Sequence, residues 1–399
     1  MRRTAMALVA VPVILSGPVP HAGAAGVGDT YYPDYGNGGY DVSHYDIRLR
    51  YQPATDELSG ATTILARATE DLTSFDLDFV LDVQSVLVGD RPAGFARQGD
   101  HELVVTPARP LRRGEPMTVR VTYADTPSTR LGEGFTVWAR TPDGAVAMGE
   151  PESAWWWFPS NDHPSDKALF DVAVAVPDGV EVISPYPFEA QGGLVTPPDA
   201  PPTALENQTR PTYGARYFQR GANPYVVVHE NSHQWFGDAV SLRRWQDIWL
   251  NEGFAMYAEW LWSEHVGDGT AQEMFDSLYS AFGEDDELWT VPPGDPGVPV
   301  ITPEVYLRGA MTVHQLRVAV GDAAFFRILR SWVAEHRYGN ADTAQFIALA
   351  ERISGRDLGA LFQAWLYAPV KPVLDTPVAA PARTPRSLLP VLSAAGLQP

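Results

Sequence analysis

The stretch Val226–Asp238, VVVHENSHQWFGD, places two of the nine histidines of the chain four residues apart, with a glutamate directly after the first. On a helix of about 3.6 residues per turn, His229 and His233 project from one face, and Glu230 lies about 100° away. Two neutral imidazoles in this arrangement can hold a zinc ion, and the adjacent carboxylate can act on its water. The stretch therefore predicts a metal-bearing helix.

A third metal ligand is predicted on the next helix, in the stretch WLNEGFAMYAEW. Eighteen residues separate Glu252 from His233, which is enough for the second helix to fold back and present its carboxylate. Two imidazoles and one carboxylate leave a fourth tetrahedral position open, as a catalytic zinc site requires. Glu259 lies seven residues beyond Glu252, on the same helix face. We expect it either to accept the second N–H of a zinc-bound histidine or to remain a solvated surface glutamate.

The hydrophobic pattern divides the chain into a β part and a helical part. Apolar residues alternate with polar ones between residues 40 and 183, as in FDLDFVLDV, which predicts antiparallel strands with one buried face each. After Asn223 the period becomes that of amphipathic helices. We expect a β domain over residues 30–184 and a mostly helical catalytic domain over residues 185–370, followed by a disordered Pro- and Ala-rich tail over residues 371–399.

Composition limits the possible partners and the compartment. The formal charge of −20 disfavours nucleic acid and anionic membranes as partners, and the absence of cysteine excludes disulfides and thiolate ligands. Residues 1–25 combine early arginines, a short apolar run and a small-residue cleavage point, which is the pattern of a signal peptide. The apolar run is shorter than the roughly 20 residues of a membrane-spanning helix. We therefore expect a secreted or extracytoplasmic protein and leave its oligomeric state open.

HENSHQWFGD followed by WLNEGFAMYAEW resembles the zinc signature of the aminopeptidase N family, the gluzincin metalloaminopeptidases that include leukotriene hydrolase. The resemblance covers about residues 40–367 and is most marked to short exported bacterial members. It implies an α+β fold, with an N-terminal antiparallel β domain followed by a thermolysin-like, mostly helical zinc peptidase domain. It also implies one zinc per chain, held by His229, His233 and Glu252, with Glu230 as the general base.

Three further motifs resemble parts of the same family. VYLRGAMT is similar to the catalytic tyrosine motif, which makes Tyr306 the donor to the developing oxyanion. ALENQTR resembles the exopeptidase motif in a degraded form, with Glu206 as its glutamate, and the segment beginning GEPESAWWW offers Glu150 as a second acidic residue. Carboxylates at these positions would bind a cationic α-amino group, so the resemblance implies peptide substrates with a free N-terminus.

The chain departs from the family pattern where Ser184 runs directly into Pro185. Family members carry further strands there, so an internal deletion is expected to leave an open or irregular cleft near residues 184–205 and weak catalysis. Two alternatives follow. One is a catalytically impaired, secreted zinc-binding protein. The other is a thermolysin-like endopeptidase, which ranks lower because Met256 stands where those enzymes carry an aspartate.

Overall fold

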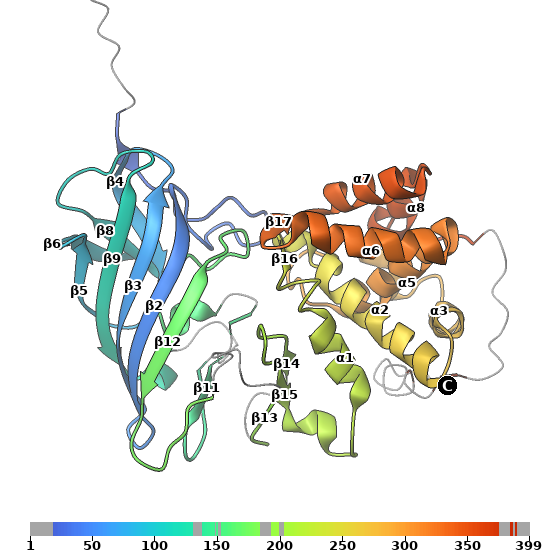
Figure 1. The fold of residues 1–399 in the computed structure, drawn as a ribbon, viewed down its shortest axis with the longest axis horizontal. Helices are drawn as coiled ribbons and strands as arrows, with labels where there is room; N and C mark the ends of the chain where they lie inside the picture. Colours follow the sequence, from blue (N-terminus) through green and yellow to red (C-terminus); the bar gives the residue numbers. More distant parts are fainter. Residues whose placement is uncertain are drawn as a thin grey trace, which may run out of the picture.

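The computed structural model describes residues 19–130, 138–147, 149–150, 153–183, 193–198, 203–374, 384–385 and 388. Within these ranges, a β-rich N-terminal part and a helical C-terminal part lie side by side (Figure 1). The predicted α+β order, β domain first, is confirmed.

Two sheets form the β-rich part. The larger has the strand order β12-β2-β3-β9-β5-β6, and the smaller has the order β1-β4-β8-β7. Their strands are β1 (His21–Ala22), β2 (Tyr40–Gln52), β3 (Glu57–Ala68), β4 (Leu72–Asp78), β5 (Val83–Val88), β6 (Arg91–Pro92), β7 (Gly94–Gln98), β8 (Glu102–Thr106), β9 (Pro116–Asp125) and β12 (Leu169–Ala175). A separate hairpin joins β10 (Trp138–Arg140) to β11 (Ala145–Ala147). The pairing is mostly antiparallel, except that β12 runs parallel to β2 and β1 runs parallel to β4.

Strand β2 shows why these residues form a sheet with a buried face. Tyr45, Ile47 and Leu49 are buried, whereas the intervening Arg48 and Arg50 are exposed. Side chains alternate across a strand, so the apolar set packs into the core between the two sheets. The predicted period of two is confirmed here.

Strand β4 differs from the prediction of one buried face. Asp76 and Asp78 alternate with Phe75 and Leu77, yet both aspartates are buried. Asn37, in the segment before β2, donates a side-chain hydrogen bond to Oδ2 of Asp78 at 3.0 Å. The sequence pattern could not show that this second face is also covered.

The helical part begins with α1 and is built around a large aromatic and aliphatic core. Its helices are α1 (Pro224–Ser232), α2 (Trp249–Val266), α3 (Ala271–Ala281), α4 (Glu287–Thr290), α5 (Pro303–Val320), α6 (Asp322–His336), α7 (Thr343–Ser354) and α8 (Gly359–Phe362). Single helical turns lie at Pro127–Thr129, Ala154–Trp156, Ala215–Phe218, Trp245–Asp247 and Gln363–Tyr367. Asp342 caps α7 with a capping box, and Gly267 ends α2 with φ of 74°.

Short strands precede α1 and were not predicted. A three-stranded sheet has the order β13-β15-β14, with β13 (Leu194–Thr196), β14 (Ala204–Leu205) and β15 (Thr212–Gly214). A further parallel pair joins β16 (Val240–Leu242) to β17 (Gly339–Ala341). The expected join between Ser184 and Pro185 lies outside the described residues.

The two parts meet through a small set of buried polar contacts. Oδ2 of Asp29 accepts hydrogen bonds from the backbone N–H of Trp245 at 3.0 Å and from Nε2 of His163 at 3.3 Å. Lys167 Nζ donates to the carbonyl of Asp238 at 2.6 Å. The loop before β12 is thereby held against the segment that follows α1, which brings the β domain up to the predicted site.

Only part of each end of the chain lies within the described residues. Residues 1–18 of the expected signal peptide lie outside the described residues, and His21–Ala22 pairs with β4. Within the expected tail, Nζ of Lys371 donates to the carbonyls of Tyr279 and Phe282 at 2.8 Å each, and Leu388 is buried. Among the described residues, no helix combines the length and hydropathy needed to span a bilayer.

Candidate metal centre and its carboxylates

Helix α1 positions the first two predicted ligands. Pro224 occupies its first turn, and the side chain of Asn223 accepts a hydrogen bond from Val226 N at 3.5 Å. His229 lies in the last turn, and His233 follows as the C-cap with helical φ of −59°. The two imidazole rings therefore lie on one face, with their centroids 4.9 Å apart.

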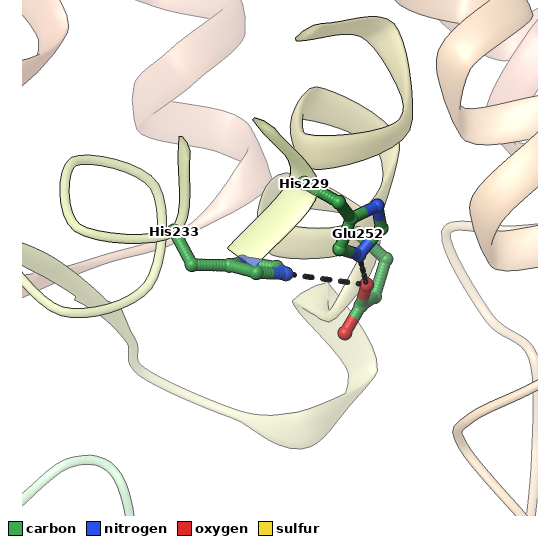
Figure 2. Close-up of side chains that lie close together, drawn as sticks. All are labelled: His229, His233 and Glu252. Atoms are coloured by element: carbon green, nitrogen blue, oxygen red, sulfur yellow. Dashed lines mark hydrogen bonds and ion pairs between the residues drawn. The ribbon is translucent and has the colours of Figure 1, made fainter. Parts of the chain in front are cut away.

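Helix α2 presents Glu252 from its first turn to both histidines (Figure 2). Oε2 of Glu252 lies 3.2 Å from Nε2 of His229 and 3.5 Å from Nε2 of His233. One ligand atom of each residue falls within 4.8 Å of the other two, and all three side chains are buried. The structure thus brings the three predicted ligands together, and the donor set of two nitrogens and one carboxylate oxygen fits zinc.

The second nitrogen of each histidine has a partner on the protein. Nδ1 of His229 lies 2.9 Å from Oε1 of Glu259, and Nδ1 of His233 lies 3.0 Å from the carbonyl of Phe236. Both acceptors favour a proton on Nδ1, which leaves the two Nε2 atoms free to coordinate a metal. Glu259 therefore takes the first of the two positions expected for it, beside a histidine rather than in solvent.

Electrostatics in this cluster favours a bound cation. Burial raises the pKa of Glu252, but the two histidines outweigh that effect and bring its pKa to about 2. Burial lowers the pKa of His233, whereas Glu206 and Glu252 raise it to about 10. The carboxylates also raise the pKa of His229 well above its usual value, against the effect of burial. A divalent metal would supply the positive charge that protons on the imidazoles otherwise provide.

Tyr306 reaches the site through an unusually close contact between α2 and α5. A Cβ added to Gly253 would lie 2.9 Å from the backbone of Gly309, so only glycine fits at this crossing. Tyr306 lies in the first turns of α5 and stacks on His229, with ring centroids 5.9 Å apart. Burial, followed by Glu252, raises the pKa of Tyr306 well above its usual value, so the phenol keeps its proton.

Three more predicted carboxylates surround the histidines. Oε1 of Glu206 lies 3.6 Å from Nδ1 of His233, and Glu206, Glu230 and His233 form a cluster whose potential ligand atoms lie within 4.8 Å of one another. Burial raises the pKa of Glu230 to about 8. Burial and the neighbouring Glu206, to which it hydrogen-bonds, raise the pKa of Glu150 well above its usual value. The structure therefore brings every predicted site residue into one region.

A cavity of about 340 Å³ lies between the two domains beside these carboxylates. Glu150 and Glu206 line it together with Asp162 from the β domain and Asp238 from the catalytic domain. The metal triad does not line this cavity, but Glu206 borders both. A ligand with a positive charge would find several carboxylates next to the triad.

Two residues of the first motif have roles that the sequence reasoning missed. The side chain of Gln234 accepts a hydrogen bond from Thr209 N at 2.8 Å and donates one to the carbonyl of Glu206 at 2.8 Å. These two bonds attach the loop that contains Glu206 to the chain just after α1. Asp238 has a buried carboxylate oxygen without a hydrogen-bond partner, and burial followed by Glu206 raises its pKa to about 8. Both Gln234 and Asp238 lie within the motif HENSHQWFGD, and this position was the only sequence signal that could have pointed to them.

Comparison with known proteins places this arrangement in a family. Residues 183–365 match the model of the peptidase family M1 domain. The M1 zinc metallopeptidase of Deinococcus radiodurans has a similar structure, with a TM-score of 0.74 and 27% identity over 88% of this chain and 100% of that one. The stretch of residues 183–365 therefore belongs to peptidase family M1.

Two proteins named aminopeptidase N match parts of the chain. Aminopeptidase N of Streptomyces lividans is 29% identical over 206 residues, which is 45% of this chain and 23% of that protein. Aminopeptidase N of Lactococcus lactis subsp. lactis is 28% identical over 240 residues, 52% of this chain and 27% of that protein. This chain thus spans about a quarter of the length of these relatives. Native yeast LTA4 hydrolase, at 18% identity with a TM-score of 0.67, shares the fold.

Proposed function

We propose that the protein is a zinc-dependent aminopeptidase that hydrolyses the first peptide bond of peptides with a free N-terminus. The observation that carries the proposal is the buried triad of His229, His233 and Glu252, with the carboxylate pair of Glu150 and Glu206 next to it. A variant of the similar Deinococcus radiodurans enzyme has been crystallised with a Tyr-Ser-Ala substrate, which supports a peptide as the ligand here.

Zinc held by the triad would lower the pKa of a coordinated water to about 7 and polarise the scissile carbonyl. Glu230 is the general base in this proposal. It is buried and follows His229 directly, so its carboxylate can take a proton from water and return it to the leaving amine. The protonated phenol of Tyr306 donates a hydrogen bond to the oxyanion that develops on the substrate.

The preference for a free N-terminus follows from charge. Glu150 and Glu206 form a hydrogen-bonded acidic pair, and such a pair is destabilised when both members are ionised in a buried place. An α-ammonium group offsets one of the two negative charges and can donate hydrogen bonds to both carboxyl groups, whereas an internal peptide bond brings no positive charge. The pair therefore sets the distance from the N-terminus at which cleavage occurs.

A digest of matched peptides tests this specificity. A tripeptide and its N-acetylated form are incubated with the enzyme, and the products are identified by mass spectrometry. Release of the N-terminal residue from the free peptide alone supports the aminopeptidase. Cleavage of the acetylated peptide at a similar rate would favour the endopeptidase alternative. Glu206→Gln should raise KM for the free peptide, because it removes one charge from the ammonium site.

We further propose that the protein is exported and acts outside the cytoplasm. The charged, then apolar, then small-residue pattern of residues 1–25 supports export. Cleavage at Ala24 or Ala25 would remove the short strand at His21–Ala22, whose backbone N–H donates to Asp71. Sequencing the N-terminus of protein recovered from the culture medium tests this, and a chain that starts at Met1 inside the cell would contradict it.

A further inference from the structure

The segment of residues 29–35, which precedes β2, contacts both domains. In Figure 1 it belongs to the blue part of the chain that extends from the β-rich part toward the helices. Tyr32 packs against the core of the helical part, and its ring lies edge-on to that of Trp245, with the centroids 6.0 Å apart. Tyr35 packs instead against the pair of buried tryptophans of the β domain. The segment therefore bridges the two domains.

The carboxylate of Asp29 joins this segment to both domains at once. Its Oδ1 accepts the backbone N–H groups of Tyr31 at 2.8 Å and Tyr32 at 3.2 Å, which fixes the local turn. Its Oδ2 accepts the backbone N–H of Trp245, from the catalytic domain, at 3.0 Å and Nε2–H of His163, from the β domain, at 3.3 Å. The exposed fraction of the Asp29 side chain is 0%.

The contacts of Asp29 call for an ionised carboxylate. Nδ1 of His163 accepts the backbone N–H of Ser165 at 3.2 Å, so the ring proton lies on Nε2 and is donated to Asp29. Burial raises the pKa of Asp29, but the hydrogen bonds from His163 and the backbone outweigh it and hold the pKa well below its usual value. An amide at this position would turn its own N–H groups toward donors on one side.

On the β-domain side, Asp29 is connected to Glu150 through one loop. His163 follows Asp162, whose Oδ2 accepts the backbone N–H of Ala154 at 2.9 Å. Ala154 lies four residues after Glu150 in the sequence. Glu150, Ala154, Asp162 and His163 all line the cavity between the domains. A shift of His163 would therefore move the loop that carries Glu150.

On the catalytic side, Asp29 is connected to the helix that carries a metal ligand. Trp245 begins the single helical turn that precedes α2, and Glu252 lies in the first turn of α2. Glu206, which hydrogen-bonds to Glu150, also belongs to the catalytic domain. The amine-binding pair of Glu150 and Glu206 thus consists of one residue from each domain, and its geometry depends on how the domains are held together.

We propose that Asp29 is a positioning residue for the amine-binding pair, which holds the β domain against the catalytic domain so that Glu150 lies beside Glu206. Asp29 does not touch the substrate, and it follows the expected cleavage point at Ala24 or Ala25, so export leaves it in the chain. The kinetic consequence rests on the proposed aminopeptidase function. The effect of Asp29 on the relative position of the domains does not.

Steady-state kinetics with an aminoacyl arylamide test the kinetic consequence. We expect Asp29→Asn to keep its zinc and a kcat within about threefold of the parent, because Glu230 and Tyr306 lie in the catalytic domain, but to raise KM about tenfold. In the Glu150→Gln background, Asp29→Asn should change KM by less than about twofold, because residues that act through one another are not additive. Effects of Asp29→Asn and Glu150→Gln on KM that multiply would overturn the proposal.

The control for these measurements is Asp34→Asn, which removes an exposed carboxylate from the same segment. It should leave both kcat and KM unchanged. A KM that rises as much in Asp34→Asn as in Asp29→Asn would show that any change of charge in the segment has this effect, and would overturn the role given to Asp29.

A distance measurement tests the position of the domains without any substrate. The chain has no cysteine, so Thr118→Cys in β9 and Arg356→Cys after α7 create the two sites for spin labels, and both positions are exposed. Double electron–electron resonance should give a broader distribution of label distances in Asp29→Asn than in its parent, and an unchanged one in Asp34→Asn. An unchanged distribution in Asp29→Asn overturns the proposal. A parent without peptidase activity would contradict the proposed function and leave this test intact.

Tyr31→Phe carries both measurements if Asp29→Asn fails to fold. It removes only a hydroxyl, which donates a hydrogen bond to Asp295 in the loop before α5 and so helps to hold the segment on the catalytic domain. We expect the same changes on a smaller scale, with KM at least about twofold higher. If neither KM nor the distance distribution changes in Tyr31→Phe, the segment does not position the domains and the proposal is overturned.

Discussion

The carboxylate of Glu259 lies 2.9 Å from Nδ1 of His229, on the side of the ring that faces away from Glu252. This contact fixes the tautomer that turns Nε2 of His229 toward the metal triad. Groups that orient metal-bound histidines commonly contribute a factor of about 10 to 100 in metal affinity. We therefore expect Glu259→Gln to weaken zinc binding by about that factor, measured by competition with a chromogenic chelator. Unchanged affinity would mean that Glu259 does not orient the histidine.

Replacing Glu230 separates metal binding from proton transfer. Glu230→Gln keeps the size of the side chain but cannot accept a proton, so we expect full zinc content and a kcat at least about 100-fold lower. Metal analysis and arylamide hydrolysis on the same preparation check both parts. A Gln variant with near-parental turnover would place the general base elsewhere.

Tyr306 should act on the transition state more than on substrate binding. Tyr306→Phe removes only the hydroxyl, and loss of one donor to an oxyanion commonly costs about 100- to 1,000-fold in kcat. KM should change little. Steady-state kinetics give the split, and a loss confined to KM would assign Tyr306 to substrate binding instead.

The contact between Gly253 and Gly309 holds α2 and α5 at the distance that brings Tyr306 to His229. A methyl group at Gly253 would meet the backbone of Gly309 at 2.9 Å, so Gly253→Ala should lower the free energy of unfolding by about 1 to 3 kcal/mol. Gly283→Ala is the control, because nothing lies within 4 Å of a Cβ there. Equal stability of the two variants in urea unfolding would show that the helices separate without cost.

Asp78 and Glu102, which face each other in the buried ends of β4 and β8, should make the stability of the protein sensitive to pH. Burial, followed by Asp76 and Asp34, raises the pKa of Glu102 from 4.5 to about 8. The folded state then holds a proton that the unfolded chain has released, so the free energy of unfolding should fall as pH rises from about 4.5 to about 8. Urea unfolding across this pH range should show a smaller fall for Glu102→Gln, and an identical fall would contradict this cause.

The candidate site was largely predictable because its signals are local. His229 and His233 are one helical turn apart, and Glu252 lies in the first turn of the next helix, so spacing and periodicity were sufficient. The sequence also indicated the change from strands to helices. Glu206 and Glu150 were found only through resemblance to family motifs, since no period or spacing connects them to the histidines.

Features that depend on long-range pairing were not predictable in the same way. Asp76 and Asp78 alternate with apolar residues and so resemble the solvent-facing side of a strand, but both are buried, and Asn37 from the segment before β2 hydrogen-bonds to Asp78. Glu102 lies opposite Asp78 only because of the register in which β8 pairs with β4, and the sequence does not show that register. The strands β13, β14 and β15 are two or three residues long, which is too short to show a period.

Hydrolysis of an aminoacyl arylamide under metal control tests the proposed function most directly. The enzyme is assayed as purified, after removal of metal by a chelator, and after addition of zinc, with His233→Ala carried through the same steps. We predict that activity disappears with the metal, returns with about one zinc at the triad, and is absent throughout in His233→Ala. Activity that persists without metal, or that zinc restores in His233→Ala, would contradict a zinc aminopeptidase built on His229, His233 and Glu252.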